Sequence, residues 1–305
     1  MIIIDSLNQL NMTRETTVTI GKFDGIHRGH RELVERIVRE AEKQNLCSVV
    51  FTIEFPDSLR IYTDEETERI LSDLGVDYWV RIPFTEELRD ESREDFLQDV
   101  LLDRLKMKVI VSGYDFTFGK GALGNADYLK EVEETFGFHY LHEDTEFDGE
   151  GAVSSTRIRK DLAEGKVEAA SFRLGRYYYV EGEIIHGAHI GSSIGFPTVN
   201  VVPGKGKLLP LFGVYSVLCE VDGKRYGGVA NLGLKPTVHN VTEPLLEAHL
   251  FDCNEDLYGK FCRISLVSFI REERKLNSLE GLKSQIALDV VSAKRTLARL
   301  NLDKE

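Results

Sequence analysis

The spacing of apolar residues changes once along the chain, near Ser155, and this change constrains the fold more than any other feature. Before it, short β-branched runs alternate with helix-like stretches in which apolar residues recur every three or four positions. The strand-like runs are TVTI (17–20), SVVFTI (48–53), DYWVRI (77–82), KVIVSG (108–113) and FHYL (138–141). Strands that alternate with helices predict an α/β domain, an open parallel sheet with helices on both faces.

After residue 155 the alternation stops. A helical stretch over 155–173 is followed by strand-like runs that short turns such as Asp222-Gly223 separate. Consecutive strands of this kind predict an antiparallel β-barrel, and a helix that begins near Ser278 is expected to close the chain. A length of 305 residues is also long for a single domain. We therefore expect two domains, over residues 1–172 and 173–305.

Composition excludes several classes of protein. The formal net charge is −13, and a strongly acidic chain is a poor binder of nucleic acid or anionic membranes. No apolar run approaches the roughly 18 residues that a membrane helix needs, and the N-terminal segment lacks the basic start of a signal peptide. The four cysteines lack metal-binding spacing and are expected to be free thiols. The chain is expected to be cytoplasmic, and its sequence leaves a homo-oligomer open.

A glycine-punctuated string, IGKFDGIHRGH, follows the first strand-like run and occupies residues 20–30. A turn that leads into a helix N-terminus is a ready anion site, because unpaired N–H groups and the helix dipole meet there. Two imidazoles beside it suit the charge that builds up during phosphoryl transfer. The alternatives are histidines that only cap the helix, or a metal site. We expect the phosphate-binding and catalytic residues to be Gly21, Phe23, Asp24, Gly25, His27, Gly29 and His30.

This string resembles the HxGH nucleotidyltransferase superfamily, and its Phe23-Asp24-Gly25 version resembles the FAD synthetase branch. The superfamily has a second signature at a helix start, which SSTRIR at 154–159 matches. The resemblance implies that the outer phosphates of ATP are held by Ser155, Thr156 and Arg159. Hydroxyls and N–H groups at a helix start, with an arginine one turn later, suit a pyrophosphate leaving group.

Between these motifs, SGYDFTFGKGALGN at 112–125 resembles a family segment that lines the nucleotide and flavin site. The resemblance implies flavin-binding roles for Asp115, Phe118 and Asn125. The alternative is a glycine-rich connection whose aromatic residues only pack.

The second half carries its own motif, GEIIHGAHIGSSIGFPTVN, at 182–200. Gly187, Gly191 and Gly195 give a loop whose backbone can fold over phosphates. Thr198 and Asn200 alternate on an extended segment and so face the same side, where a hydroxyl and an amide oxygen suit Mg²⁺. The alternative is a hairpin with a kink at its proline.

Further strings follow in the order of the riboflavin kinase family, among them GVANLGLKPT (228–237) and IREERKLNSLEGLKSQI (270–286). From about residue 17 to about residue 300 the chain resembles the bacterial bifunctional riboflavin kinase/FAD synthetase family. The resemblance implies Glu247 as general base, Thr198 and Asn200 as magnesium ligands and Arg271 beside the flavin.

The resemblance implies that ATP with Mg²⁺ converts riboflavin to FMN, and that ATP then converts FMN to FAD with release of pyrophosphate. One departure bears on the second step. Where the family often has a proline-histidine-proline string, residues 54–66 read EFPDSLRIYTDEE and the loop is short. A chain active only as a riboflavin kinase therefore stays open, as does a flavin-binding sensor, which would need neither the histidines nor Glu247.

Overall fold

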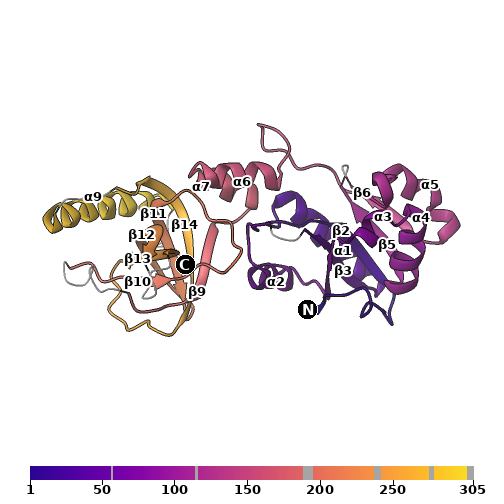
Figure 1. The fold of residues 1–305 in the computed structure, drawn as a ribbon, viewed down its shortest axis with the longest axis horizontal. Coiled ribbons are helices and arrows are strands. Elements are labelled where there is room, and N and C mark those ends of the chain that lie inside the picture. Colours follow the sequence, from indigo (N-terminus) through magenta and orange to yellow (C-terminus); the bar gives the residue numbers. More distant parts are fainter. Residues whose placement is uncertain (56–57, 114–115, 188–194, 237–241, 275–277, 301–305) are drawn as a thin grey trace. The chain divides into compact units, whose positions relative to one another are not determined.

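The computed structural model describes residues 1–55, 58–113, 116–187, 195–236, 242–274 and 278–300. The chain divides into two compact units, Met1–Ser155 and Thr156–Glu305 (Figure 1). The expected helical connection consists of two helices, α6 (Ser155–Ala163) and α7 (Val167–Leu174). α7 packs against two strands of the second unit. The division between the units therefore comes earlier than residue 172, and the functional boundary after residue 172 stays a prediction.

The first unit is built on a six-stranded sheet in the order β1-β4-β3-β2-β5-β8. Every neighbouring pair is parallel, which confirms the predicted open parallel sheet. The strands are β1 (Ile2–Ile4), β2 (Thr16–Gly21), β3 (Cys47–Glu54), β4 (Tyr78–Pro83), β5 (Met107–Ser112) and β8 (His139–His142).

Helices cover both faces of this sheet. Successive side chains of a strand point to opposite sides, so the apolar residues of one strand contribute to a core on each face. In β3, Val49 and Phe51 belong to one apolar core, whereas Val50 belongs to another. The first core contains residues of the π-helix η1, and the second contains residues of α1 and α2. The helical segments are α1 (Arg28–Gln44), α2 (Asp64–Asp73), α3 (Glu86–Asp90), α4 (Arg93–Asp95), η1 (Phe96–Arg104), the 3-10 turn η2 (Lys120–Ala122) and α5 (Ala126–Phe136).

The strand order reverses direction beside β2, with β3 on one side and β5 on the other. In open α/β sheets, ligands bind outside the carboxyl ends of the strands at such a reversal. β2 ends at Gly21, so the IGKFDGIHRGH string leaves the sheet at this point. A small two-stranded ribbon, β6 (Thr117–Phe118) with β7 (Gly124–Asn125), follows β5 in the chain.

The second unit is a curled antiparallel half-barrel with the strand order β10-β13-β12-β11-β14-β9. Every neighbouring pair is antiparallel, and two register shifts interrupt the pairing of β11 with β14. The closing helix α9 (Leu279–Ala298) packs on β11, β12 and β14, and Ser278 caps its start as predicted. The strands are β9 (Tyr178–Glu183), β10 (Val199–Val201), β11 (Gly213–Val221), β12 (Lys224–Pro236), β13 (Thr242–Leu250) and β14 (Phe261–Glu272).

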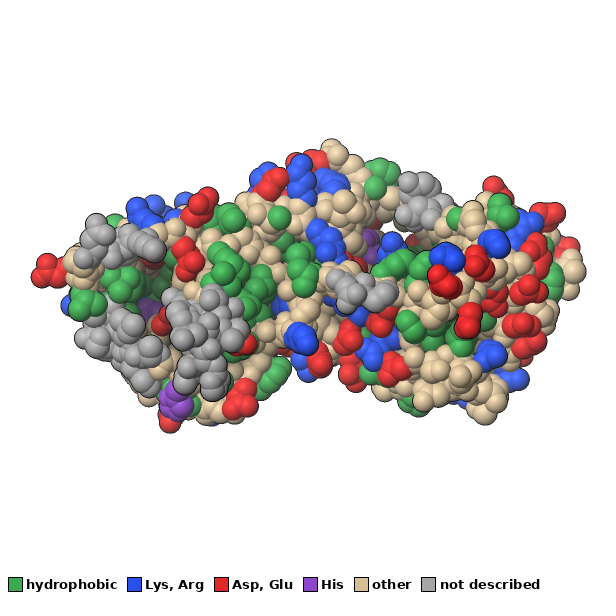
Figure 2. Space-filling view, viewed as in Figure 1, with side chains coloured by type: hydrophobic (Ala, Val, Ile, Leu, Met, Phe, Trp, Pro, Cys, Tyr) green, Lys and Arg blue, Asp and Glu red, His purple; other side chains and the backbone are tan. Residues whose placement is uncertain are grey.

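The surface of the first unit reflects the acidic composition of the chain. On the face drawn in Figure 2, acidic side chains gather where α3, α4 and α5 lie. The first turns of α3 and α4 alone carry Glu86, Glu87, Glu94 and Asp95. Among the helices of the described residues, none has the length and apolar composition that crossing a bilayer requires. All four cysteines are free thiols, as expected.

Candidate active sites

The turn between β2 and α1 has a strained backbone that its packing holds in place. Phe23, Gly25 and Ile26 all have positive φ values, of 44°, 80° and 39°. The left-handed region is costly for residues with a side chain, and it persists only where the surroundings enforce it. Phe23 and Ile26 are completely buried, and a Cβ on Gly25 would lie 2.9 Å from Cδ1 of Ile61. Burial therefore fixes this turn in one conformation.

The turn delivers both histidines to the start of α1. His27 is the N-cap residue, and its Nδ1 accepts a hydrogen bond from the backbone N–H of His30 at 3.3 Å. The two imidazole rings stack, with centroids 3.7 Å apart and an angle of 16° between their planes. His27 therefore does cap the helix, which was the alternative to a catalytic role. It also lies with His30 at the positive end of α1. Two adjacent ring donors at a helix N-terminus suit an anionic ligand.

Asp24 connects this turn to two distant segments. Its side-chain Oδ1 accepts a hydrogen bond from the Ile61 N–H at 2.9 Å, and its carbonyl oxygen accepts one from the Ser155 hydroxyl at 2.8 Å. The first residue of α6 is therefore attached to the turn, although 131 positions separate the two residues in sequence. Thr156 and Arg159 follow on α6 and belong to the second compact unit, so their roles toward ATP stay predictions.

The segment predicted to bind flavin has clear packing roles. Phe118 is buried, and its ring contacts the rings of Phe96, Phe116 and Tyr128. Asn125 caps α5 through a 2.9 Å hydrogen bond that its Oδ1 accepts from the Tyr128 N–H. Asp115 lies outside the described residues. The flavin-binding roles of these three residues stay predictions.

In the second unit, a strand pairing brings Thr198, Asn200 and Glu247 together. Asn200 of β10 is the register partner of Glu247 on β13, and the Thr198 hydroxyl donates a hydrogen bond to Glu247 Oε1 at 2.9 Å. Asn200 is buried, and a Cβ on Gly187 would lie 2.5 Å from its Nδ2. Glycine at position 187 therefore leaves the space that the Asn200 amide occupies. Gly195 has a φ of 91°, and Gly191 lies outside the described residues.

Two neighbours of this group were not identified from the sequence. Asn231 of β12 is the register partner of Glu247 on its other side, and the Asn231 amide donates to Glu273 Oε1 at 2.7 Å. The row Asn200, Glu247, Asn231 therefore crosses three adjacent strands on one face of the half-barrel. Asn231 stands in the GVANLGLKPT string, which was the only signal for it in the sequence.

Arg271, the predicted flavin neighbour, lies on β14, and two strands separate β14 from β13. Its guanidinium forms a bidentate ion pair with Asp289 of α9, with Nε–Oδ1 and Nη2–Oδ2 distances of 3.0 and 2.7 Å. The Asp289 side chain is 5% exposed. Asp289 was not identified because an isolated aspartate in a helix carries no motif.

The donor atoms of the second site fit a hard divalent cation. Hydroxyl, amide and carboxylate oxygens stand together at Thr198, Asn200 and Glu247, and Mg²⁺ prefers oxygen ligands. Within the described part of the chain, no group of three or more His, Cys, Asp or Glu residues has the arrangement of a metal site. A metal that enters with the phosphates of ATP is consistent with both findings.

Comparison with known proteins assigns each unit to a family. Residues 9–157 match the family model for FAD synthetase, and residues 174–297 match that for riboflavin kinase. The bifunctional riboflavin kinase/FMN adenylyltransferase of Escherichia coli K12 is 37% identical over 290 residues, which cover 91% of each chain. The enzyme of the same name from Bacillus subtilis is 32% identical over 299 residues, with 94% of each chain covered.

A solved structure gives the same picture of the fold. A crystal structure described as a macrolide-efflux protein from Streptococcus pneumoniae superimposes with a TM-score of 0.83 at 30% identity, and covers 95% of this chain and 97% of its own. Sequence likeness at this level over nine-tenths of the chain, with both family models matched in order, leaves one conclusion. The chain belongs to the bifunctional riboflavin kinase/FMN adenylyltransferase family.

Proposed function

We propose that the Glu247 site phosphorylates riboflavin to FMN and that the His27–His30 site adenylylates FMN to FAD, with ATP as co-substrate in both steps. The observation that carries the assignment is that Asn200 and Glu247 are paired on adjacent strands and that Thr198, just before β10, hydrogen-bonds to Glu247. These three residues lie in the unit that matches riboflavin kinase, while the histidine pair lies in the unit that matches FAD synthetase.

At the kinase site, Glu247 acts as general base. It takes the proton of the terminal ribityl hydroxyl as that oxygen attacks the γ-phosphorus of ATP, and ADP leaves. General-base help contributes about 10²–10⁴-fold in rate. The Thr198 hydroxyl, 2.9 Å from Oε1, holds the carboxylate in one orientation. Mg²⁺, held by Thr198 and Asn200, supplies neutralisation of the phosphate charge when it is bound. Gly187, Gly191 and Gly195 border the phosphates, and Arg271 borders the flavin.

At the adenylylation site, no base is required, because the attacking oxygen belongs to a phosphate that is already ionised. This oxygen attacks the α-phosphorus of ATP, and pyrophosphate leaves. The imidazoles of His27 and His30 and the N-terminal N–H groups of α1 stabilise the charge that builds up on the phosphates. Ser155, Thr156 and Arg159 hold the departing pyrophosphate, while Asp115, Phe118 and Asn125 border the flavin.

Incubation of the purified protein with riboflavin and Mg-ATP tests the proposal. Chromatography should show that riboflavin is consumed, that FMN rises and then falls, and that FAD accumulates with pyrophosphate. Chelation of divalent cations should stop FMN formation, and Mg²⁺ should restore it. FMN as the sole product would support a kinase-only protein, and no turnover of riboflavin would contradict the proposal.

A further inference from the structure

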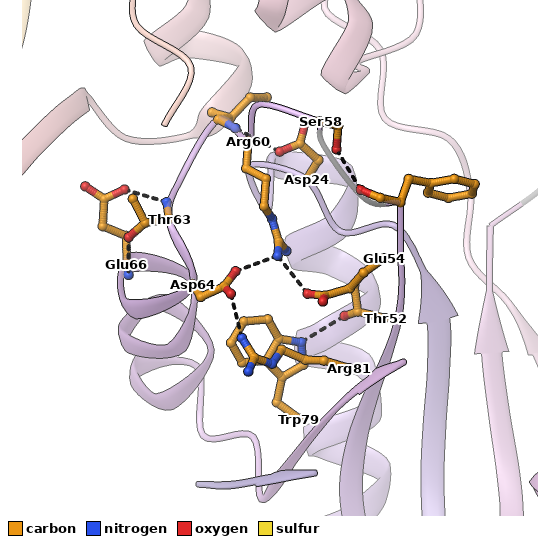
Figure 3. A network of polar contacts seen from close by, with 12 residues as sticks. Asp24, Thr52, Glu54, Ser58, Arg60, Thr63, Asp64, Glu66, Trp79 and Arg81 are labelled. Carbon is orange, nitrogen blue, oxygen red and sulfur yellow. Dashed lines mark hydrogen bonds and ion pairs between the residues drawn. The ribbon is translucent and has the colours of Figure 1, made fainter. Parts of the chain in front are cut away.

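The short loop between β3 and α2, where the chain departs from its family, is closed by an arginine. Arg60 Nη1 lies 2.8 Å from Glu54 Oε1, on the last residue of β3, and 2.5 Å from Asp64 Oδ1, on the first residue of α2 (Figure 3). One guanidinium therefore connects the last residue of β3 with the first residue of α2.

A second arginine extends this cluster to the neighbouring strand. Arg81 of β4 donates to the other Asp64 oxygen at 2.7 Å and, through Nε, to Asp5 Oδ1 at 2.7 Å. The side chains of Arg60 and Arg81 are 21% and 18% exposed. Burial lowers the pKa of Arg81, but the carboxylates of Asp5 and Asp64 outweigh burial and hold that pKa above its ordinary value. A partly buried network of alternating charges is screened less than an isolated surface pair.

The residue after Arg60 contacts the histidine turn directly. Ile61 is completely buried, its N–H donates to Asp24 Oδ1 at 2.9 Å, and its side chain occupies the space beside Gly25. On the other side, Thr63 and Glu66 form a reciprocal capping box that fixes the start of α2. Ile61 therefore lies in the chain between Arg60 and the capped start of α2; Figure 3 shows Arg60, Asp24 and the Thr63–Glu66 capping box.

The turn that Ile61 supports is the strained one. Its left-handed residues Phe23 and Ile26 need a rigid surrounding, and the histidine pair begins one residue later at His27. A shift of about 1 Å in a group that positions reacting atoms can cost about 10²-fold in rate. A displacement of Ile61 would therefore reach the histidine turn through the hydrogen bond from Ile61 to Asp24.

We propose that Arg60 is a positioning residue for adenylyl transfer, which holds Ile61 against Asp24 and Gly25 and so keeps the two histidines aligned. This inference rests on the proposed function of the His27–His30 site. It also assigns a role to the segment that replaces the proline-histidine-proline string of the family.

The test measures FAD formation from supplied FMN and Mg-ATP. Arg60→Ala should lower kcat by about 10-fold or more and change the KM for ATP by less than about threefold, because alignment rather than binding is lost. Riboflavin phosphorylation by the same preparation should be unchanged, and a far-ultraviolet circular dichroism spectrum like that of the wild type shows that the first unit is folded. The matched control is Arg39→Ala, which removes the same charge from an exposed pair with Glu35 on α1 and should leave both activities unchanged.

Three further variants separate positioning from general stability. Arg60→Lys keeps a charge that can reach either carboxylate and should recover at least about half of the lost activation free energy. The double variant Asp24→Ala/Arg60→Ala should have a kcat less than about twofold below that of Asp24→Ala alone. The reason is that Arg60 acts through Asp24, so removing Asp24 already removes the effect of Arg60. Glu54→Gln, which weakens the cluster from its other side, should lower kcat in the same direction.

A kcat of Arg60→Ala within about twofold of wild type would overturn the inference. So would a double variant whose loss of kcat equals the product of the two single-variant losses, because the two residues would then act independently. An Arg60→Lys variant as slow as Arg60→Ala, or an equal loss in Arg39→Ala, would also contradict it. His30→Ala is measured beside these variants. If His30→Ala is inactive and Arg60→Ala is normal, this inference alone fails; if both are normal, the site assignment fails.

Discussion

The two proposed sites of this chain are built from different parts of the polypeptide, although the reactions proposed for them are related phosphorus chemistry. The first is built mainly on backbone, a turn with three left-handed residues and the N–H groups at the start of α1, with two stacked imidazoles beside it. The second relies on side chains that project from neighbouring antiparallel strands, with Glu247 between Asn200 and Asn231. The difference follows from the acceptor, because a phosphate arrives ionised whereas a ribityl hydroxyl must lose a proton. A base is therefore expected in the second site and is unnecessary in the first.

The largest effect expected from this comparison is at the base. Glu247→Gln keeps the size and hydrogen-bonding shape of the side chain but removes its basicity, so FMN formation should fall by about 10²–10⁴-fold. FAD formation from supplied FMN should be nearly unchanged. Initial rates of both reactions check this, with Glu243→Gln, an exposed glutamate on the same strand, as control. Equal loss of both activities would mean that the sites are not separate.

The converse variant probes the histidine site. His30→Ala should lower FAD formation by about 10²-fold or more, the usual cost of removing a placed donor to developing charge. Riboflavin phosphorylation should stay within about twofold of wild type, because the Glu247 site does not use this residue. His139→Ala, an exposed histidine at the start of β8, is the control. Survival of FAD synthesis in His30→Ala would leave the histidine with a capping role only.

The boundary between the halves can be tested with two fragments. A fragment of residues 156–305 keeps α6 and α7, whereas one of 173–305 loses the buried Leu162 and Val167. Each buried aliphatic side chain contributes about 1.5–3 kcal/mol, so the shorter fragment should be several kcal/mol less stable. Denaturant unfolding measures the difference, and riboflavin kinase activity shows whether the longer fragment is functional. Equal stabilities would favour the boundary after residue 172 that the sequence predicts.

Further contacts support the longer fragment. The Leu211 N–H donates to the Leu162 carbonyl at 2.8 Å, and the Tyr178 N–H donates to the Ser171 hydroxyl at 3.2 Å. Arg173, which is buried, forms an ion pair with the partly buried Asp161. All three link α6 or α7 to the half-barrel or to each other, so truncation at residue 173 leaves polar partners unsatisfied.

The smallest effect expected is at the ion pair behind Arg271. Asp289→Asn keeps one hydrogen bond but removes the charge that orients the guanidinium, so the KM for riboflavin should rise severalfold while kcat changes by less than about twofold. FAD formation from FMN should not respond. Steady-state kinetics with varied riboflavin give the answer, and a lowered kcat with unchanged KM would show that Arg271 does not bind the flavin.

Much of this architecture follows from short-range patterns. Strand–helix alternation predicted the parallel sheet, consecutive strand-like runs with short turns predicted an antiparallel barrel that the structure shows as a half-barrel, and the ordered motif strings indicated the family. The sequence also suggested Thr198, Asn200 and Glu247 as a group, although the resemblance rather than spacing linked Glu247 to the other two. Such inferences succeed because helical and extended periodicity, and a turn that needs glycine, are properties of consecutive residues.

Only the tertiary structure decided which distant residues meet. The Ser155–Asp24 hydrogen bond, the Asn231–Glu273 contact and the Arg271–Asp289 pair each join separate elements. Arg60 belongs with them, because its partners stand at the ends of a strand and a helix. Several of these residues stand in strings that the sequence analysis identified, but no string indicates the distant partner, since strand register and helix packing bring polar side chains together without any fixed spacing in the chain. The sequence therefore determined the kinds of elements and the family and indicated the residues proposed for the two sites, and packing decided which distant residues support them.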